Sequence, residues 1–120
     1  MQTREVTVRK IFSAEAVSNT TVYSDVFDLG SFAQSGIFAL QVEVSGATIT
    51  ANYELSNNNV DFLTPSTGAA ISTDFTPASG PGADGKDIIS FQPEPSRFMR
   101  IAVTESAADP GVITAWLVMQ

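Results

Sequence analysis

The sequence predicts an all-β protein, an antiparallel β-sandwich of immunoglobulin-like or jelly-roll type with about seven to eight short strands. Three observations predict this fold. Apolar and polar residues alternate with a period of two along most of the chain, as in strands that bury one face. Clusters of Gly, Pro, Asn and Ser interrupt the alternation roughly every eight to twelve residues. No segment has the length and periodicity of a helix that connects parallel strands, so we expect antiparallel pairing.

The first two strands are predicted near the N-terminus. In the first, over residues 6–12, Val8 and Phe12 share the core face, and polar residues form the outer face. Residues 13–17 are expected to form at most one helical turn. A second continuous strand is predicted over residues 22–29.

The next two strands flank the short turn Ser45-Gly46-Ala47. Residues 38–45 and 49–55 both alternate, and two such runs around a Gly-containing turn predict a β-hairpin. This pairing would make Glu43 and Glu54 neighbours across the hairpin. The cluster of asparagines that follows predicts a turn, because Asn tolerates left-handed backbone.

Four more strands are expected in the second half, a weak one over residues 70–75 and others over 87–92, 98–104 and 112–119. The segment Pro77–Gly85 is rich in Pro and Gly and predicts an exposed, mobile loop. The last strand is apolar on both faces. It therefore lies either at the centre of a sheet covered on both sides, or with its second face in an interface.

The 120 residues fit one sandwich domain spanning residues 1–120, because two cores would leave each half marginally stable. Residues 1–12 are expected to form an extended N-terminal strand or arm. No apolar run approaches the ~20 residues that span a bilayer, and no secretory signal precedes the first strand. We expect the protein to be soluble and made in a cytoplasm.

The composition argues against an enzyme. The chain contains no Cys and no His, which excludes disulfides, thiolate and imidazole catalysis, and nearly all zinc sites. We therefore expect no catalytic residues and no cofactor. The net charge of −7 argues against binding to nucleic acid or to anionic membranes.

Weaker chemical candidates favour structural interpretations. The segment Asp84-Gly85-Lys86-Asp87 offers oxygen ligands for calcium, but it lacks the alternating acids of an EF-hand and contains a lysine, so a turn is the simpler interpretation and no metal site is predicted. The other acids fall on polar strand faces, unlike a glycosidase pair. Most aromatic residues fall on apolar faces and are expected in the core rather than in a sugar-binding platform, with Trp116 as the exception.

A longer pattern resembles the small β-sandwich virion proteins of tailed bacteriophages, namely head decoration (cement) proteins and tail-associated modules. It consists of Val26-Phe27-Asp28-Leu29, a loop, Phe38-Ala39-Leu40-Gln41-Val42, Ser45-Gly46, and Tyr53-Glu54-Leu55-Ser56-Asn57. It covers about Val22 to Phe62. Asn58 and Asn59 stand where the pattern has Asp-Gly, and Phe62 stands where it has Trp.

The resemblance implies a non-enzymatic virion protein, most simply a capsid decoration protein that binds the head shell. A tail or baseplate module and a carbohydrate-binding sandwich module are the alternatives. The implied partners are the major capsid protein or other virion proteins, with self-assembly into a dimer or trimer. The basic N-terminal segment and the two-faced last strand supply the candidate interface residues, which are Arg4, Arg9, Lys10, Val112, Trp116 and Val118.

Overall fold

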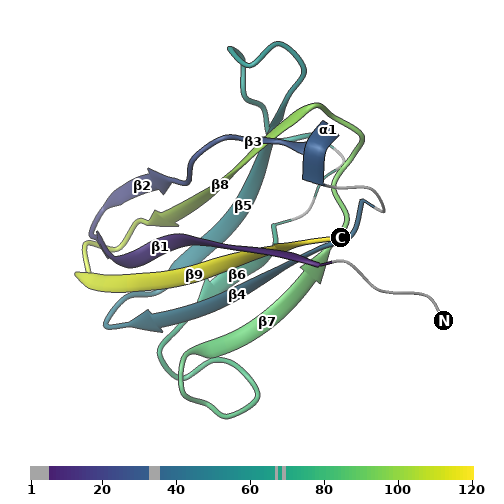
Figure 1. Cartoon of the computed structure of the whole chain (residues 1–120). Coiled ribbons are helices and arrows are strands. Elements are labelled where there is room, and N and C mark those ends of the chain that lie inside the picture. The colour runs from purple at the N-terminus through teal and green to yellow at the C-terminus, as the bar shows by residue number, and fades with distance from the viewer. Residues whose placement is uncertain (1–5, 33–35, 67, 69) are drawn as a thin grey trace, which may run out of the picture.

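The computed structural model describes residues 6–32, 36–66, 68 and 70–120, and in these residues it consists mainly of strands packed as two antiparallel sheets (Figure 1). The expected β-sandwich is confirmed, with slightly more strands than predicted. The strands are β1 (Thr7–Val17), β2 (Thr20–Tyr23), β3 (Phe27–Asp28), β4 (Phe38–Ser45), β5 (Ile49–Ser56), β6 (Ser72–Phe75), β7 (Lys86–Phe91), β8 (Phe98–Glu105) and β9 (Gly111–Met119). A single helical turn, α1 (Leu29–Phe32), follows β3.

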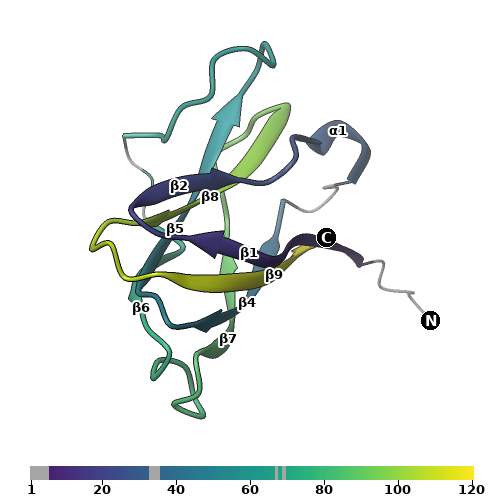
Figure 2. The same ribbon diagram turned by 90° about the vertical axis from the view of Figure 1, so that its left-hand side faces the viewer.

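The strand order identifies the sandwich as a jelly roll. Sheet A has the order β1-β9-β4-β7, and sheet B has the order β2-β8-β5-β6, with β3 also paired to β8. The two sheets lie face to face (Figure 2). Nearly every pair of neighbours is distant in sequence, and the chain passes repeatedly from one sheet to the other. In an immunoglobulin fold, by contrast, several consecutive strands pair within one sheet.

The core lies between the inner faces of the two sheets. The most completely buried apolar side chains alternate along the long strands, as the sequence pattern predicts, and include Leu40, Val42, Ile101, Val103, Ile113 and Leu117. Each such side chain contributes about 1.5–3 kcal/mol through burial. The ring of Phe91 stacks on both Phe38 and Tyr53, with centroids 5.6 Å apart in each pair. Burial raises the pKa of Tyr53 to about 12, helped by its hydrogen bond to Glu94.

The predicted hairpin is wrong, although both of its strands exist. β4 pairs with β7 and β9 in sheet A, whereas β5 pairs with β6 and β8 in sheet B. The turn at Gly46 therefore carries the chain across the core. Consequently Glu43 pairs in register with Lys86 and Glu54 with Arg100, so the two acids are not neighbours.

Two N-terminal predictions are also corrected. The strand expected over residues 22–29 is interrupted, because Ser24 turns inward and bonds to the edge of β8. Its backbone N–H donates to the Ile101 carbonyl at 2.9 Å, and its hydroxyl accepts the Ile101 N–H at 2.8 Å. Residues 13–17 continue β1 as an irregular strand instead of forming a helical turn, with a left-handed residue at Ala14 (φ 49°).

The connecting loops project from opposite ends of the molecule. The Asn-rich loop after β5 lies at one end, and the loop between β6 and β7 lies at the other (Figure 1). Residues 76–85 of the second loop form hydrogen-bonded turns, including Ala83 N–H to Gly80 O at 3.1 Å and Gly85 N–H to Ser79 O at 2.9 Å. Among the described residues, no helix is long and apolar enough to cross a membrane.

Candidate interaction surface

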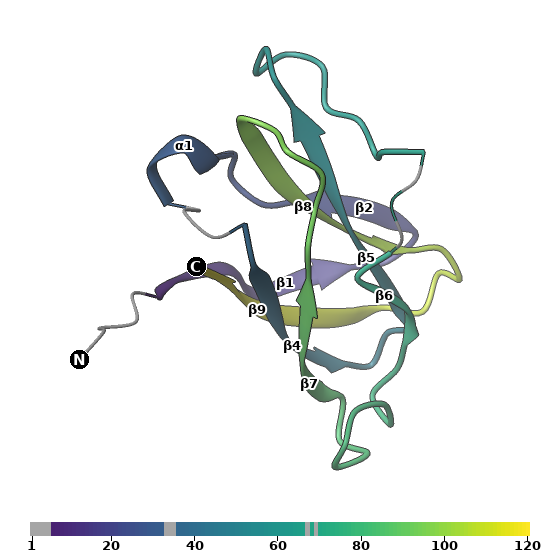
Figure 3. The same cartoon turned by 90° about the vertical axis from the view of Figure 1, so that its right-hand side faces the viewer.

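The outward surface of sheet A, which we call the sheet A face, carries six apolar and six polar side chains. Figure 3 shows its four strands, β1, β9, β4 and β7, from another side. Its members are the outward residues in register across these strands, namely Val8, Lys10, Ala39, Gln41, Glu43, Lys86, Ile88, Ser90, Val112, Thr114, Trp116 and Val118. Three of its aliphatic side chains are strongly exposed, with relative exposures of 57% for Val8, 64% for Ile88 and 40% for Val112.

Trp116 lies in the middle of the sheet A face. Trp116 of β9 pairs in register with Lys10 of β1 on one side and with Gln41 of β4 on the other. Gln41 in turn pairs with Ile88 of β7. The Lys10 ammonium lies 5.4 Å from the centre of the indole ring. An ammonium at this distance is attracted to the face of the ring. The aliphatic stem of Lys10 and the indole therefore extend the apolar surface while a positive charge stays beside it.

A β-bulge in β1 explains why Val8 points outward. Lys10 pairs with Trp116 but Phe12 pairs with Ala115, so one extra residue, Ile11, is accommodated in β1 between these two positions. An extra residue reverses the alternation. The sequence analysis placed Val8 and Phe12 on one buried face. That prediction is wrong for Val8, which is exposed, and right for Phe12, which is buried.

The structure brings together most of the predicted interface residues. Lys10, Val112, Trp116 and Val118 share the sheet A face. Arg9 is exposed on the same edge strand but has the opposite alternation, in register with Leu117. Arg4 lies outside the described residues.

Sequence reasoning missed two parts of this surface. One is Val8, which the pattern assigns to the core. The other is Ile88, which lies on the opposite face of its strand from Ile89 and follows the charged pair Lys86-Asp87. The signal was present at Ile88, because an apolar residue in the polar phase of a strand marks an exposed apolar position.

The outer surface of sheet B is different in character. The Arg100 guanidinium lies between the rings of Tyr23 and Phe62, with its central carbon 4.1 Å and 4.6 Å from their centres. It also donates to Glu54 Oε1 at 2.7 Å. Tyr23, expected in the core, is 49% exposed here. The Tyr23 and Trp116 rings lie on different sheets, so they do not form one row for stacking a sugar chain.

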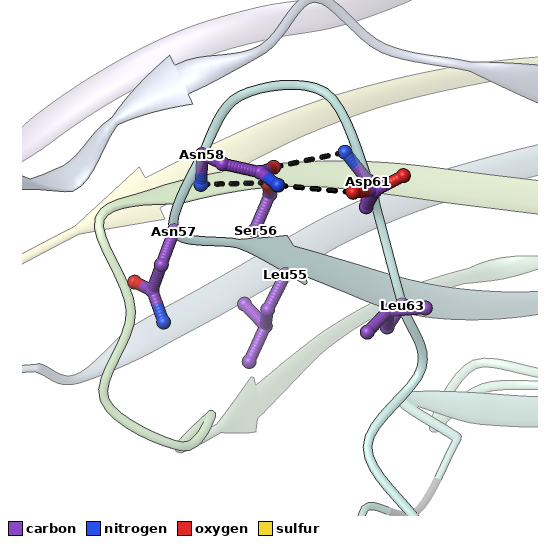
Figure 4. Close-up of a pocket in the computed structure, with 6 residues that line it drawn as sticks. All are labelled: Leu55, Ser56, Asn57, Asn58, Asp61 and Leu63. Carbon is purple, nitrogen blue, oxygen red and sulfur yellow. Dashed lines mark hydrogen bonds between the residues drawn. The ribbon is translucent and has the colours of Figure 1, made fainter.

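The Asn-rich loop after β5 closes over a shallow depression (Figure 4). This depression is lined by Leu55, Ser56, Asn57, Asn58, Asp61 and Leu63. Asn58 organises the loop, because its Oδ1 accepts from the backbone N–H of Asp61 and its Nδ2 donates to the Asp61 carboxylate, both at 2.9 Å. The predicted turn is confirmed. Ser56, Asn58 and Asp61 bond to one another, and Asn57 accepts the backbone N–H of Arg97, so these groups form a turn motif.

The acidic side chains are held by structural contacts or dispersed. Within residues 6–32, 36–66, 68 and 70–120, no group of three or more His, Cys, Asp or Glu side chains converges on a point that could hold a metal. Asp28 accepts from Arg97 at 2.6 Å, and this hydrogen bond lowers the pKa of the Asp28 carboxyl. The buried carboxylate of Glu105 accepts backbone N–H groups, chiefly that of Asn19, and these bonds lower its pKa.

Together these observations define a jelly-roll sandwich with two different outer surfaces, one with Arg100 between two aromatic rings and one with exposed aliphatic side chains around Trp116. The sequence matches no protein-family model and no curated protein. Among solved structures, the chain is similar to VP2 of infectious bursal disease virus in its subviral particle, with a TM-score of 0.55 and 11% identity. That match covers 95% of this chain and 31% of VP2, so the chain spans about a third of the longer protein.

Two other solved structures have lower scores. The SPBc2 prophage-derived protein YomS has a TM-score of 0.49 and 13% identity, with 98% of both chains covered. The CBM22-1 xylan-binding domain of Paenibacillus barcinonensis Xyn10C has a TM-score of 0.45 and 12% identity, with 93% of this chain and 80% of that chain covered. At such identities a likeness shows the fold alone.

Proposed function

We propose that this chain is a non-enzymatic structural protein of a bacteriophage virion, and that it decorates the head by binding the major capsid protein through the sheet A face. The observation that carries the proposal is that three exposed aliphatic side chains, those of Val8, Ile88 and Val112, share that face with Trp116. Exposed apolar surface is unfavourable in water, and large apolar side chains gathered on one face of a protein typically mark a site of association.

Two further observations support this role. The jelly roll is a recurrent architecture of viral shell proteins, and the fold comparison with VP2 agrees with it. The residues of β3, β4 and β5 carry the pattern that resembles phage virion proteins. A surface of this kind acts by shape and apolar contact, which fits a chain that has neither His nor Cys.

Co-sedimentation with purified heads of the phage that encodes the chain tests the proposal. We expect the wild-type protein to pellet with heads. We expect Val8→Ser with Ile88→Ser to reduce binding by about ten-fold or more, because two exposed anchors of the face are lost.

Val60→Ser with Leu63→Ser is the matched control. These side chains are 77% and 67% exposed, but they lie on and just beyond the Asn-rich loop, away from the sheet A face. This variant should bind like wild type. Binding to purified tails but not heads would move the role to the tail or baseplate. Retention on a glycan array with no virion binding would instead support a carbohydrate-binding module.

The expected dimer or trimer remains a proposal. Sedimentation equilibrium across a range of protein concentrations tests it. Within sheet A, β7 is a regular edge strand, whereas β1 at the other edge is interrupted by its bulge. An edge without a bulge accepts an added strand more readily. We therefore expect a homo-oligomer to form through β7. Ile88→Pro, which changes that strand, should weaken it.

A further inference from the structure

The sheet A face carries a small positive charge although the whole chain is acidic. The net charge is −7. On the sheet A face, Lys10 and Lys86 lie on the two edge strands, and Glu43 is the one acid among its residues. The face therefore carries a net charge of +1, and the remaining residues carry −8.

Arg97, just before β8, and Arg100, within β8, both pair with acids. Arg97 bonds to Asp28 at 2.6 Å, and Arg100 bonds to Glu54 at 2.7 Å. Lys10, by contrast, lies against the Trp116 ring, whereas Lys86 has the acid Glu43 in register beside it at the opposite edge of the sheet A face. The potential outside sheet A is therefore more positive than that around the rest of the molecule.

We infer that the surface bound by the sheet A face is a protein surface with an apolar centre flanked by carboxylates. This inference rests on the proposed function and specifies the chemistry of the partner. The apolar centre would cover Val8, Trp116 and Ile88, and the carboxylates would meet Lys10 and Lys86. A second copy packed face to face is disfavoured, because it would bring two sets of like charges together.

The first test measures binding to purified heads at two salt concentrations. Lys10→Gln with Lys86→Gln removes two positive charges from the face. Asn57→Asp with Asn59→Asp adds two negative charges on the exposed Asn-rich loop and gives the same net charge, −9 against −7 for the natural chain. Asp at position 57 keeps an oxygen to accept the Arg97 N–H.

We expect the lysine variant to bind about three- to ten-fold more weakly than wild type at about 50 mM salt, and the asparagine variant to change less than about two-fold. The difference should shrink at about 0.5 M salt, where exposed charges are screened within a few ångströms. Equal weakening of both variants would show an effect of net charge alone and would overturn the inference.

The second test needs no virion, so it separates failure of the inference from failure of the proposed function. Anilinonaphthalenesulfonate is an apolar anion whose absorption overlaps tryptophan emission, and Trp116 is the only tryptophan in the chain. We expect energy transfer from Trp116 to the dye in the wild-type protein, weakened in the lysine variant and retained in the asparagine variant.

Absence of head binding by the wild-type protein would contradict the proposed function, and the dye experiment would still decide the charge complementarity. Equal dye transfer in both variants would overturn the inference. So would a wild-type dimer that Val8→Ser alone dissociates, since Val8 lies on β1, away from the β7 edge, and that result would assign the face to a second copy.

Discussion

Glu105 is a buried carboxylate that acts as an acceptor for loop backbone. It ends β8, is 1% exposed, and accepts the N–H groups of Asn19 and Ala107 at 2.7 Å each. Charged acceptors make stronger hydrogen bonds than neutral ones. Glu105 therefore fastens the β1–β2 turn and the β8–β9 loop to the end of sheet B.

This arrangement predicts a pH-dependent contribution to stability. The pKa of Glu105 is lowered from its ordinary value of 4.5, so its contribution is complete at neutral pH and is lost as the pH falls through the lowered value. We expect Glu105→Gln to unfold at lower temperature than wild type at pH 7. An amide has one acceptor oxygen, and its NH₂ group would face a backbone N–H that the second carboxylate oxygen now accepts. The difference should narrow progressively in acid.

Thermal unfolding of both proteins between about pH 7 and pH 2 measures this effect. Glu15→Gln is the control, because Glu15 is exposed on β1. Asp28 also has a lowered pKa, but it is present in all three proteins and does not affect the comparison. A Glu105→Gln protein as stable as wild type at pH 7 would contradict the assigned role.

Gly46 is required where the chain crosses between the sheets. Its φ is +82°, and a Cβ added there would lie 2.9 Å from the Pro110 carbonyl oxygen. We expect Gly46→Ala to destabilise the protein by about 2–4 kcal/mol, from backbone strain together with the clash. Chemical denaturation measures the free energy of unfolding.

Gly36→Ala separates these two causes. Gly36 also has a positive φ, +69°, but the added Cβ meets none of the described atoms within 4 Å. We therefore expect it to cost only about 1 kcal/mol. Equal costs at the two glycines would show that the close approach to Pro110 is unimportant.

At the scale of elements, the bulge in β1 decides which residues reach the surface. The chain has no cysteine, so single introduced thiols report exposure directly. We expect Val8→Cys to react rapidly with a thiol reagent and Ala115→Cys, at 0% exposure, to react on the order of a hundred-fold more slowly, after local opening. Comparable protection of both thiols would return Val8 to the core and remove it from the sheet A face.

The alternating pattern was sufficient to locate most strands but not to pair them. The residues around Leu40 and around Ile49 alternate clearly between apolar and polar, so the sequence pattern locates both strands correctly. Both residues would also be buried if β4 and β5 formed a hairpin, and for that reason the pattern could not assign the strands to different sheets. The bulge at Ile11 is a second feature that the pattern could not reveal, because a residue in a bulge looks like any other apolar residue in the sequence.

The candidate site was only partly predictable for the same reason. Trp116 and Val118 were recognised because β9 is apolar on both faces, and that observation needs no knowledge of the neighbouring strands. Val8 and Ile88 join the face only through register across β1, β9, β4 and β7. Register depends on the bulge and on the strand order, neither of which the sequence pattern specifies.

At the scale of the whole molecule, the uneven charge distribution should be measurable without a partner. Iodide and caesium quench tryptophan fluorescence by contact, and their efficiencies depend on local potential. Although the chain carries −7 overall, we expect iodide to quench Trp116 more efficiently than caesium at low salt, because Lys10 lies beside the ring. Lys10→Gln should reduce the preference for iodide. More efficient quenching by caesium in the wild-type protein would contradict the positive potential proposed for this face.

Pairing of β1 with β9 brings Thr7 and Met119 into register at one edge of sheet A. A short peptide linker could therefore join Thr7 to Met119, and new ends could be opened in the loop between β6 and β7 without breaking a strand. Such a circularly permuted chain would keep the jelly roll while moving any fused label to the far end of the sandwich. A label attached at Thr7 or Met119, by contrast, would lie beside Val8 and Val118 and obstruct the surface proposed to bind.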